Sequence, residues 1–465
     1  MRVSLIHPAV LLLILPVVTR AENFDAQVQK ASEQIMGVLE ESEKEMTAGH
    51  FQQANQKLLD AFPEKTRTPA QSFILGNLVF EMDRSLSYRL HQAAALREKE
   101  NAKVAWEWGL EQHRAGEYAG AVAAYDVVSR ARPDFAVPYA LKADCLLRLN
   151  QVNEAVAVWK KSEQARSGSI EEMESMICAV HREPAPYRRR EELLARVMEK
   201  QDVDAAQDLI CLDCTFPRDW WNIGPYIKFL KHDAAAIEGA LKLPADDLRM
   251  RSMRCAVECA LADRGKAKSV RAVLKRHRLL LDDEQTVPSH GGLLSTILTL
   301  AMDADVVDEK VLRGPLATKL DAAARSSKIP ELWNFAAYAV PREADALLKH
   351  ERTAWDATGN GRFAAMFLMI KSRGELAEND PDLQAALKQF PESGGVQRVA
   401  YEVAKKHGHV TRELLANAAR AEFTHFSSFV APATVVNRPR SDYLRQYFAE
   451  LAKMPQEAEA TTKPQ

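Results

Sequence analysis

The strongest constraint on the fold of this chain is a pattern of residue types that returns after 34 positions. Between residues 102 and 169, apolar side chains recur with helical spacing, whereas a strand would need strict alternation. One coincidence would mean little in a chain with 19 Gly and 21 Pro, so we judge several positions together. The first unit has Gly109, Gly116, Tyr118, Ala121, Tyr125 and Pro133. At the positions 34 residues after the first five of these, the second unit has Ala143, Asn150, Val152, Ala155 and Trp159.

Each of these residue types suits a steric role in a hairpin of two helices. Small residues at 109 and 143 let the two helices approach closely. Gly116 and Asn150 tolerate the left-handed conformation that ends the first helix. Tyr125 and Trp159 would fill the gap to a neighbouring helix. The pattern therefore predicts stacked helical hairpins rather than one compact bundle.

This set of positions resembles the tetratricopeptide repeat (TPR) family. The resemblance implies an all-α fold, a right-handed helical-hairpin solenoid with a diverged helical middle. It is specific over about 70 residues, and Gly408, which follows Gly374 by 34 positions, belongs to a weaker copy. The predicted organisation is a signal peptide at 1–21, N-terminal TPR-like repeats at 22–181 (clearest at 102–169), a diverged helical region at 188–345, C-terminal TPR-like repeats at 346–430, a capping helix at 441–454 and a disordered tail at 455–465.

The N-terminus predicts export. Arg2 precedes an apolar stretch at 9–18, and small residues at Thr19 and Ala21 fit a cleavage site after Ala21. About ten apolar residues are fewer than the roughly 20 that span a bilayer, although an uncleaved anchor is the alternative. We expect a periplasmic or secreted protein, with a bacterial envelope favoured, and no integral span after signal removal.

Composition and missing motifs narrow the function. Apolar residues make up 47% and charged residues 27% of the chain, as in folded proteins, and the net charge of -2 gives no indication of a nucleic-acid partner. Signatures of serine hydrolases, zinc proteases, phosphate-binding loops and dinucleotide sites are absent from the sequence. We therefore predict a protein that is not an enzyme and uses no cofactor and no metal.

Two pairs of cysteines leave three interpretations open. Cys211 and Cys214 form a Cys-x-x-Cys, and Cys255 and Cys259 lie about 40 residues further on in an apolar helical stretch. They can be plain core thiols, they can form disulfides in an oxidising compartment, or they can hold zinc. Cys145 and Cys178 are most simply core residues.

The resemblance also implies a concave groove lined by the first helix of each unit. Two positions depart from the family's carboxylate-binding members, because Leu110 and Asp144 stand where those members carry Asn. The lining is otherwise apolar with a cationic bias, although these side chains could simply solvate the array. The positions carried over are Lys103, Trp106, Leu110, His113, Arg114, Val137, Asp144, Leu147 and Arg148, and near the C-terminus Leu368, Lys371, Arg398, Glu402, Lys405 and Lys406.

These features predict a non-catalytic interaction or assembly scaffold of the cell envelope that holds a segment of a partner protein in the groove. One alternative is an envelope enzyme or glycan-binding protein whose site lies in the diverged middle, around Trp220, Trp221 and the cysteines. Another is a structural spacer without a partner.

Overall fold

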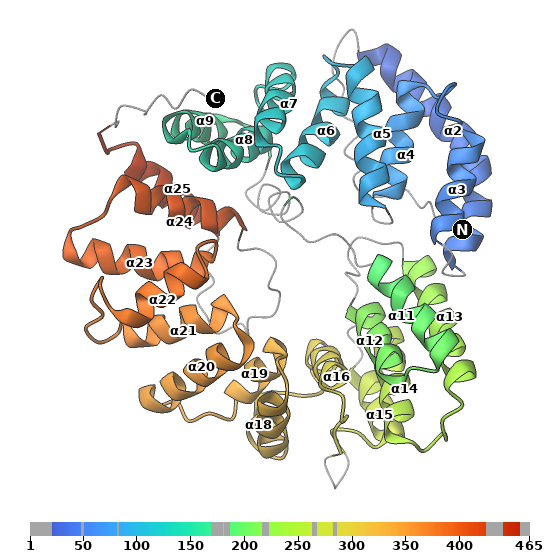
Figure 1. Cartoon of the computed structure of the whole chain (residues 1–465), viewed down its shortest axis with the longest axis vertical. Helices are drawn as coiled ribbons and strands as arrows, with labels where there is room; N and C mark the ends of the chain where they lie inside the picture. Colours follow the sequence, from blue (N-terminus) through green and yellow to red (C-terminus); the bar gives the residue numbers. More distant parts are fainter. Residues whose placement is uncertain are drawn as a thin grey trace. The chain divides into compact units, whose positions relative to one another are not determined.

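A computed structural model describes residues 21–47, 51–80, 83–168, 180, 187–215, 223–262, 267–281, 286–424 and 440–455. Within these ranges regular structure is helical, apart from one isolated bridge between Phe135 and Ser167 (Figure 1). Many consecutive helices pack against each other as hairpins, among them α6 with α7 and α8 with α9. The predicted all-α array of helical hairpins is therefore confirmed. Residues 1–20 of the predicted signal peptide (1–21) lie outside the described residues, and so do the residues after 455.

The chain forms two compact units, and each of them is made from two separate stretches of sequence. The first comprises Met1–Leu90 and Pro184–His350, and the second His91–Glu183 and Glu351–Gln465. The block predicted at 22–181 is thus divided after residue 90. Helix α5 (Arg84–Arg97) and helix α20 (Ala344–Thr358) run across the boundaries.

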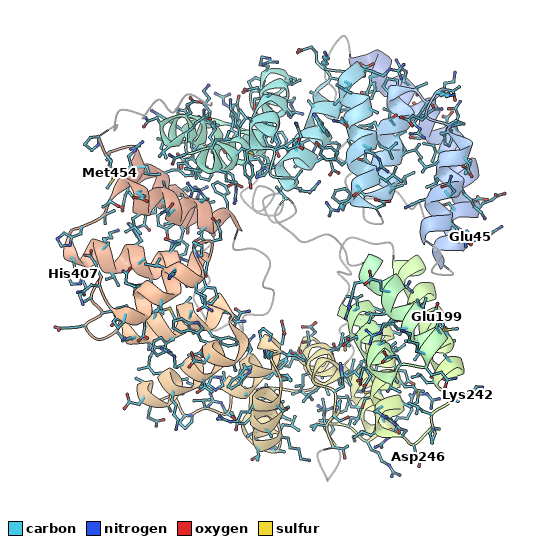
Figure 2. All side chains as sticks on the ribbon, viewed as in Figure 1. Glu45, Glu199, Lys242, Asp246, His407 and Met454 are labelled. Carbon is cyan, nitrogen blue, oxygen red and sulfur yellow. The ribbon has the colours of Figure 1, made fainter. Side chains whose placement is uncertain are left out.

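The first unit contains α2 (Ala21–Thr47), α3 (Phe51–Ala61), α4 (Pro69–Val79), α11 (Tyr187–Lys200), α12 (Val203–Thr215), α13 (Ile223–Leu241), α14 (Leu248–Leu261), α15 (Ala267–His277), α16 (Gly291–Asp303), α17 (Glu309–Arg313), α18 (Ala317–Ser326) and α19 (Pro330–Ala337). The second contains α6 (Ala102–Arg114), α7 (Tyr118–Ala131), α8 (Ala136–Arg148), α9 (Val152–Gln164), α21 (Gly361–Lys371), α22 (Pro381–Gln389), α23 (Gly394–His407), α24 (Arg412–Thr424) and α25 (Arg440–Leu451). Side chains on turns, such as Lys242 and Asp246, are exposed (Figure 2). Of the described helices, none is long and apolar enough to cross a membrane.

The strongest repeats fold as the sequence predicts. Helix α6 pairs with α7, and α8 pairs with α9. Gly116 and Asn150 end the first helix of each hairpin with φ of 78° and 61°, which confirms the predicted left-handed turns. Asn101 begins α6 by accepting hydrogen bonds from the backbone N–H groups of Lys103 and Val104.

Gly109 marks the closest approach within the first hairpin. A Cβ atom built there would lie 2.9 Å from Cε1 of Tyr125 and 3.2 Å from Cβ of Ala124, and Tyr125 is fully buried. We expect Gly109→Leu to lower the free energy of unfolding by about 1–3 kcal/mol, because the added side chain overpacks the hairpin. Urea denaturation of the full chain measures the change.

Gly37 supplies the matched control, since it also lies within a helix but a Cβ there would meet nothing within 4 Å. Gly37→Leu should be neutral or should stabilise by up to about 1 kcal/mol, because glycine is a poor helix former. Equal losses at both positions would show that close packing at Gly109 is not the reason.

The second unit is closed by its C-terminal helices. Helix α24 packs against α8 and α25 packs against α9. The ring of Trp159 stacks on Phe448 with centroids 4.6 Å apart and planes 7° apart, and Phe423 meets it edge-on at 6.1 Å. Arg420 donates a hydrogen bond of 2.9 Å to the carbonyl oxygen of Leu147. Helix α25 (Arg440–Leu451) covers most of the segment predicted as a capping helix at 441–454, and it packs on the repeats of the same unit.

A buried ion cluster joins three helices of the first unit. Arg190 of α11 lies between Asp213 of α12 and Asp233 of α13, and each of the three residues is at most 2% exposed. Its Nε atom is 3.3 Å from Asp213, and its terminal nitrogen pairs with Asp233. Two buried carboxylates thus lie against one guanidinium, and burial of the two like charges favours a proton on a carboxyl group of this cluster.

Candidate functional site

Most of the predicted groove positions in the strong repeats lie inside the protein. Five of them are buried, and Arg148 keeps only 10% of its side chain exposed. Lys103, Trp106 and Arg114 are half-buried. A side chain without exposed surface cannot contact a partner in this state of the protein. The buried five are Val137, Leu110, His113, Asp144 and Leu147.

The polar members of this set form a network inside the second unit. His113 lies between Tyr125 and Asp144, with its Nδ1 3.2 Å from the Tyr125 hydroxyl and its Nε2 3.1 Å from Oδ2 of Asp144. The other oxygen of Asp144 accepts a hydrogen bond of 2.9 Å from Nε of Arg148. Burial raises the pKa of Tyr125 well above its ordinary value, so its hydroxyl stays protonated. These contacts tie α6, α7 and α8 together.

A second buried pair links α5 to α6. Nδ1 of His91 lies 3.4 Å from Oε1 of Glu111, and Arg114 approaches the same oxygen at 3.9 Å. Both residues of the His91–Glu111 pair are at most 4% exposed. Arg114, which the sequence placed in the groove, therefore has a carboxylate partner within its own unit.

Two of the C-terminal cations of the predicted groove, Arg398 and Lys405, are also paired. Arg398 forms two hydrogen bonds of 2.8 Å with the carboxylate of Glu422 and lies 3.7 Å from the ring centre of Tyr443. Lys405 is 46% exposed, but its Nζ lies 2.9 Å from the Tyr401 hydroxyl. The structure thus brings His113, Asp144 and Arg148 together, whereas Arg398 and Lys405 contact other residues of α23–α25.

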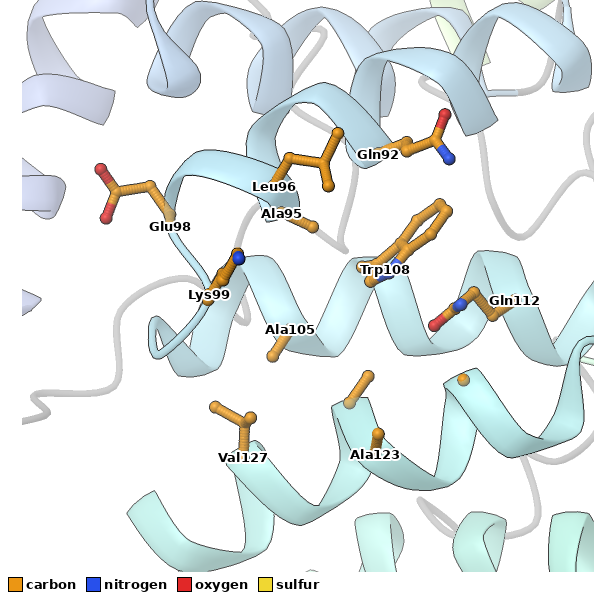
Figure 3. Close-up of a pocket in the computed structure, with 12 residues that line it drawn as sticks. Gln92, Ala95, Leu96, Glu98, Lys99, Ala105, Trp108, Gln112, Ala123 and Val127 are labelled. Atoms are coloured by element: carbon orange, nitrogen blue, oxygen red, sulfur yellow. The ribbon is translucent and has the colours of Figure 1, made fainter.

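An open groove lies instead on another side of the strong repeats. It has a volume of about 340 Å³ and is bounded by α5, α6 and α7. Trp108 extends from α6 toward α5, while Ala123 and Val127 face the same space from α7 (Figure 3). Leu96 at its border is 65% exposed. The lining comprises Gln92, Ala95, Leu96, Glu98, Lys99, Ala105, Trp108, Gln112, Gly120, Ala123, Ala124 and Val127, which we call the α5–α7 groove.

The α5–α7 groove combines a small-residue floor with a polar atom that lacks a partner. A Cβ at Gly120 would lie 2.0 Å from the side chain of Gln112, so the amide occupies the space above Gly120 and would have to move if a side chain were added there. Oε1 of Gln112 is buried and accepts no hydrogen bond from the described residues. A buried acceptor without a donor costs about 1–3 kcal/mol, which favours a bound group that donates to it.

Sequence reasoning missed this groove, although one signal was present. Ala105, Trp108 and Gln112 are three and four residues apart, so they share one face of α6. Trp106 lies on a different face and contacts Tyr125 and Phe135. The family resemblance directed attention to the face of Trp106.

The four cysteines of the middle region are free thiols in the structure. Burial raises the pKa of Cys211 to about 12. The hydrogen bond with Cys259 and then burial raise the pKa of Cys255 well above its ordinary value. Thiols of this kind are poor nucleophiles, so the site does not support redox catalysis. Trp220, Trp221 and Cys178 lie outside the described residues.

A second cavity, of about 430 Å³, lies in the diverged middle between α12, α13, α14 and α15. Its apolar wall includes Met250 and Met253. Of its two carboxylates, Glu238 pairs with Arg254 and Glu258 pairs with Arg276, each at 2.7 Å. Because both are engaged in ion pairs, this cavity lacks a carboxylate pair available for acid–base chemistry.

Comparison with known proteins gives limited information. The sequence matches no protein-family model and no curated protein. Among solved structures, one similar chain comes from a complex of Naa15 and Naa10 bound to HypK-THB, with 13% identity over 93% of this chain and 72% of that chain and a TM-score of 0.23. Another is the TPR domain of P58(IPK), with 13% identity over 83% of this chain and 99% of that chain and a TM-score of 0.21. Both TM-scores are low, so the fold assignment depends on the hairpins described above.

Proposed function

We propose that this protein is a non-catalytic interaction scaffold and that a segment of a partner protein binds in the α5–α7 groove. The observation that carries the proposal is the open apolar groove on the most regular repeats of the chain. It replaces the concave groove expected from the sequence, because five of the positions expected there are buried.

The lining indicates what the partner presents. Trp108, Leu96 and the alanines of the floor suit an apolar side chain, and burying one stabilises a complex by about 1.5–3 kcal/mol. A backbone N–H or a side-chain donor beside it would satisfy Oε1 of Gln112. Stable interfaces bury about 800 Å² on each partner, so the partner must also contact surface around the groove.

The predicted signal peptide supports a partner in the cell envelope. The alternative, an enzyme or glycan-binding site in the middle region, has less support, because both carboxylates of the second cavity are held in ion pairs.

A photo-crosslinking residue at position 123 tests the proposal in intact cells of the source organism. Ala123 is exposed and lines the groove, whereas Ala119 is exposed on the same helix but does not line it. We expect a crosslinked envelope protein from position 123 and not from position 119. Trp108→Ala should weaken binding of the purified partner about tenfold or more, because truncating a central aromatic residue removes a binding hot spot.

The matched pair Ala123→Arg and Ala119→Arg separates binding from stability. Both substitutions are on the surface and should change the free energy of unfolding by less than about 0.5 kcal/mol. Only the first should reduce binding. Equal crosslinking from positions 119 and 123 would reject the groove as the binding surface, and cytoplasmic crosslinked proteins would reject the envelope location.

A further inference from the structure

Helix α15 of the first unit presents a row of cations to solvent. One face of the helix packs on α14 (Figure 1), and its buried residues are Val270, Val273, Leu274 and His277. On the opposite, exposed face, cations occur at spacings of three and four residues, and another follows directly after the helix. Helix α15 contains neither Asp nor Glu. We call this set the α15 stripe: Lys268, Arg271, Lys275 and Arg278.

The cations of the α15 stripe differ from the neighbouring cations, which have a carboxylate partner. Arg276 lies 2.7 Å from Oε2 of Glu258, and His277 lies 3.1 Å from the same oxygen. None of the four side chains of the stripe forms an ion pair or a hydrogen bond within the part of the chain that the structure describes. Three acidic residues follow at 282–284, outside that part. The stripe therefore presents four positive charges that no described carboxylate compensates.

The stability of the helix does not explain the stripe. Lys268 lies in the first turn of α15, where the positive end of the helix dipole disfavours a cation. Arg271 is three residues after Lys268 and four residues before Lys275, and like charges at these spacings destabilise a helix. Lys275 and Arg278 do suit the dipole, because they lie near its negative end. A partner with negative charge would relieve the repulsion along the stripe.

The remaining residues of this face indicate which kind of partner fits. Helix α15 contains no aromatic residue, so it has no ring on which a nucleic-acid base could stack. Ala272 is exposed between the cations, but it is too small to anchor in a pocket of a partner protein as hot-spot residues do. Lys268 and Lys275 are about 10 Å apart along the helix. A positive surface without anchors suits a partner that presents many mobile negative groups on a plane.

We propose that the α15 stripe binds the surface of a bilayer that contains anionic phospholipids. Clusters of Lys and Arg on an amphipathic helix are attracted to anionic headgroups, and lipids that move laterally can gather around fixed charges. The predicted export supports this partner, because an envelope protein lies next to bilayers and away from nucleic acid. The stripe belongs to the first unit and the α5–α7 groove to the second, so the inference does not depend on the groove.

Electrostatic binding of this kind has a measurable size. Each Lys or Arg close to an anionic bilayer strengthens binding roughly fivefold, so two of them contribute about 25-fold. Salt weakens the attraction, because the screening length falls from about 10 Å at 0.1 M to about 3 Å at 1 M. Binding should therefore require anionic lipid, low salt and the cations of the stripe together.

The test is co-sedimentation of the full chain with vesicles of equal parts phosphatidylglycerol and phosphatidylcholine, and with vesicles of phosphatidylcholine alone. At about 0.1 M salt we expect stronger binding to the anionic vesicles, and this difference should vanish at about 1 M salt. Lys268→Gln combined with Lys275→Gln should weaken binding to the anionic vesicles about 25-fold. This double variant should melt no lower than the wild type, because it removes repulsion between like charges.

Lys160→Gln combined with Lys161→Gln is the matched control, because these two lysines are exposed on α9 and their loss changes the net charge equally. It should leave binding unchanged. Every variant keeps residues 1–21, so the apolar N-terminus contributes equally to all of them. Equal weakening in the two double variants would overturn the proposal, because binding would then follow net charge alone. Equal binding to both kinds of vesicle would also overturn it, and so would tighter binding to polyglutamate or duplex DNA than to the anionic vesicles.

Discussion

Trp159→Ala should cost about 3–5 kcal/mol of the free energy of unfolding and should release α24–α25 from α8–α9. The indole is 2% exposed and stacks on Phe448, with Phe423 against its edge. Truncation leaves a cavity between segments that are far apart in sequence, so the repeats of α6–α9 lose their C-terminal cover. Urea denaturation gives the energy, and hydrogen exchange over residues 412–424 and 440–451 gives the location.

Two further variants test whether the loss of stability is specific to the buried position of Trp159 and to its contact with Phe448. Trp108→Ala truncates the same residue type in the open α5–α7 groove, where Trp108 is only half-buried, and should cost less. Trp159→Phe keeps an aromatic ring against Phe448 and should recover part of the loss. If exchange over α24 and α25 is as slow in Trp159→Ala as in the wild type, Trp159 does not hold these helices in place.

Arg190→Met should destabilise the first unit by about 3–5 kcal/mol at pH 8. The substitution removes the guanidinium that pairs with both Asp213 and Asp233 and leaves these two buried carboxylates without it. Arg189→Met is the matched control, because Arg189 is 54% exposed and only 3.7 Å from a half-exposed Asp208. An exposed pair contributes about 0–1 kcal/mol, so the control should change little.

The same cluster gives a pH dependence of known sign. Burial raises the pKa of Asp213 to about 7, although Arg190 opposes the rise. The carboxyl titrates near 3.9 in an unfolded chain, so the folded state holds its proton more tightly between these pH values. The contribution of this proton to stability is therefore complete below about pH 4 and is lost as the pH rises through about 7.

Asp213→Asn should remove this dependence, because the amide cannot ionise but can still accept a hydrogen bond from Arg190. We expect the variant to lose less stability than the wild type between pH 5 and pH 8, as measured by urea denaturation at each pH. Arg190→Met should be less harmful at pH 5 than at pH 8, because protonation removes the negative charge of the buried Asp213 carboxylate. An Arg190→Met penalty that is equal at both pH values would contradict this account.

The repeats were predictable because their determinants are local. Each determinant acts on neighbours within the same 34-residue unit. They are a glycine at 109, residues that tolerate positive φ at 116 and 150, and an aromatic residue at 125. The structure confirms the positive φ at Gly116 and Asn150 and the close approach of Gly109 to Tyr125. Steric requirements of this kind leave a signature in the order of residues.

The candidate site was less predictable, because exposure depends on what packs against a helix. The family pattern assigns His113, Asp144 and Leu147 to a groove. It carries no information about the contacts that bury these side chains in this chain. Leu147 lies beside Arg420, which is 273 positions away in sequence. Trp108 and Ala123 were overlooked because the groove positions carried over from the family lie on a different face of α6 and include no residue of α7.

The sequence by itself therefore determined the building unit of this protein: helical hairpins with a 34-residue period, their turns and their closest contacts. Only the tertiary structure decided which hairpins meet, namely that α24–α25 cover α8–α9 and that the open surface is the α5–α7 groove. The physical reason is the separation in sequence over which each kind of interaction acts. Backbone conformation and packing within a hairpin follow from side chains a few turns apart, whereas burial of a face depends on apolar contacts between segments that no local spacing relates.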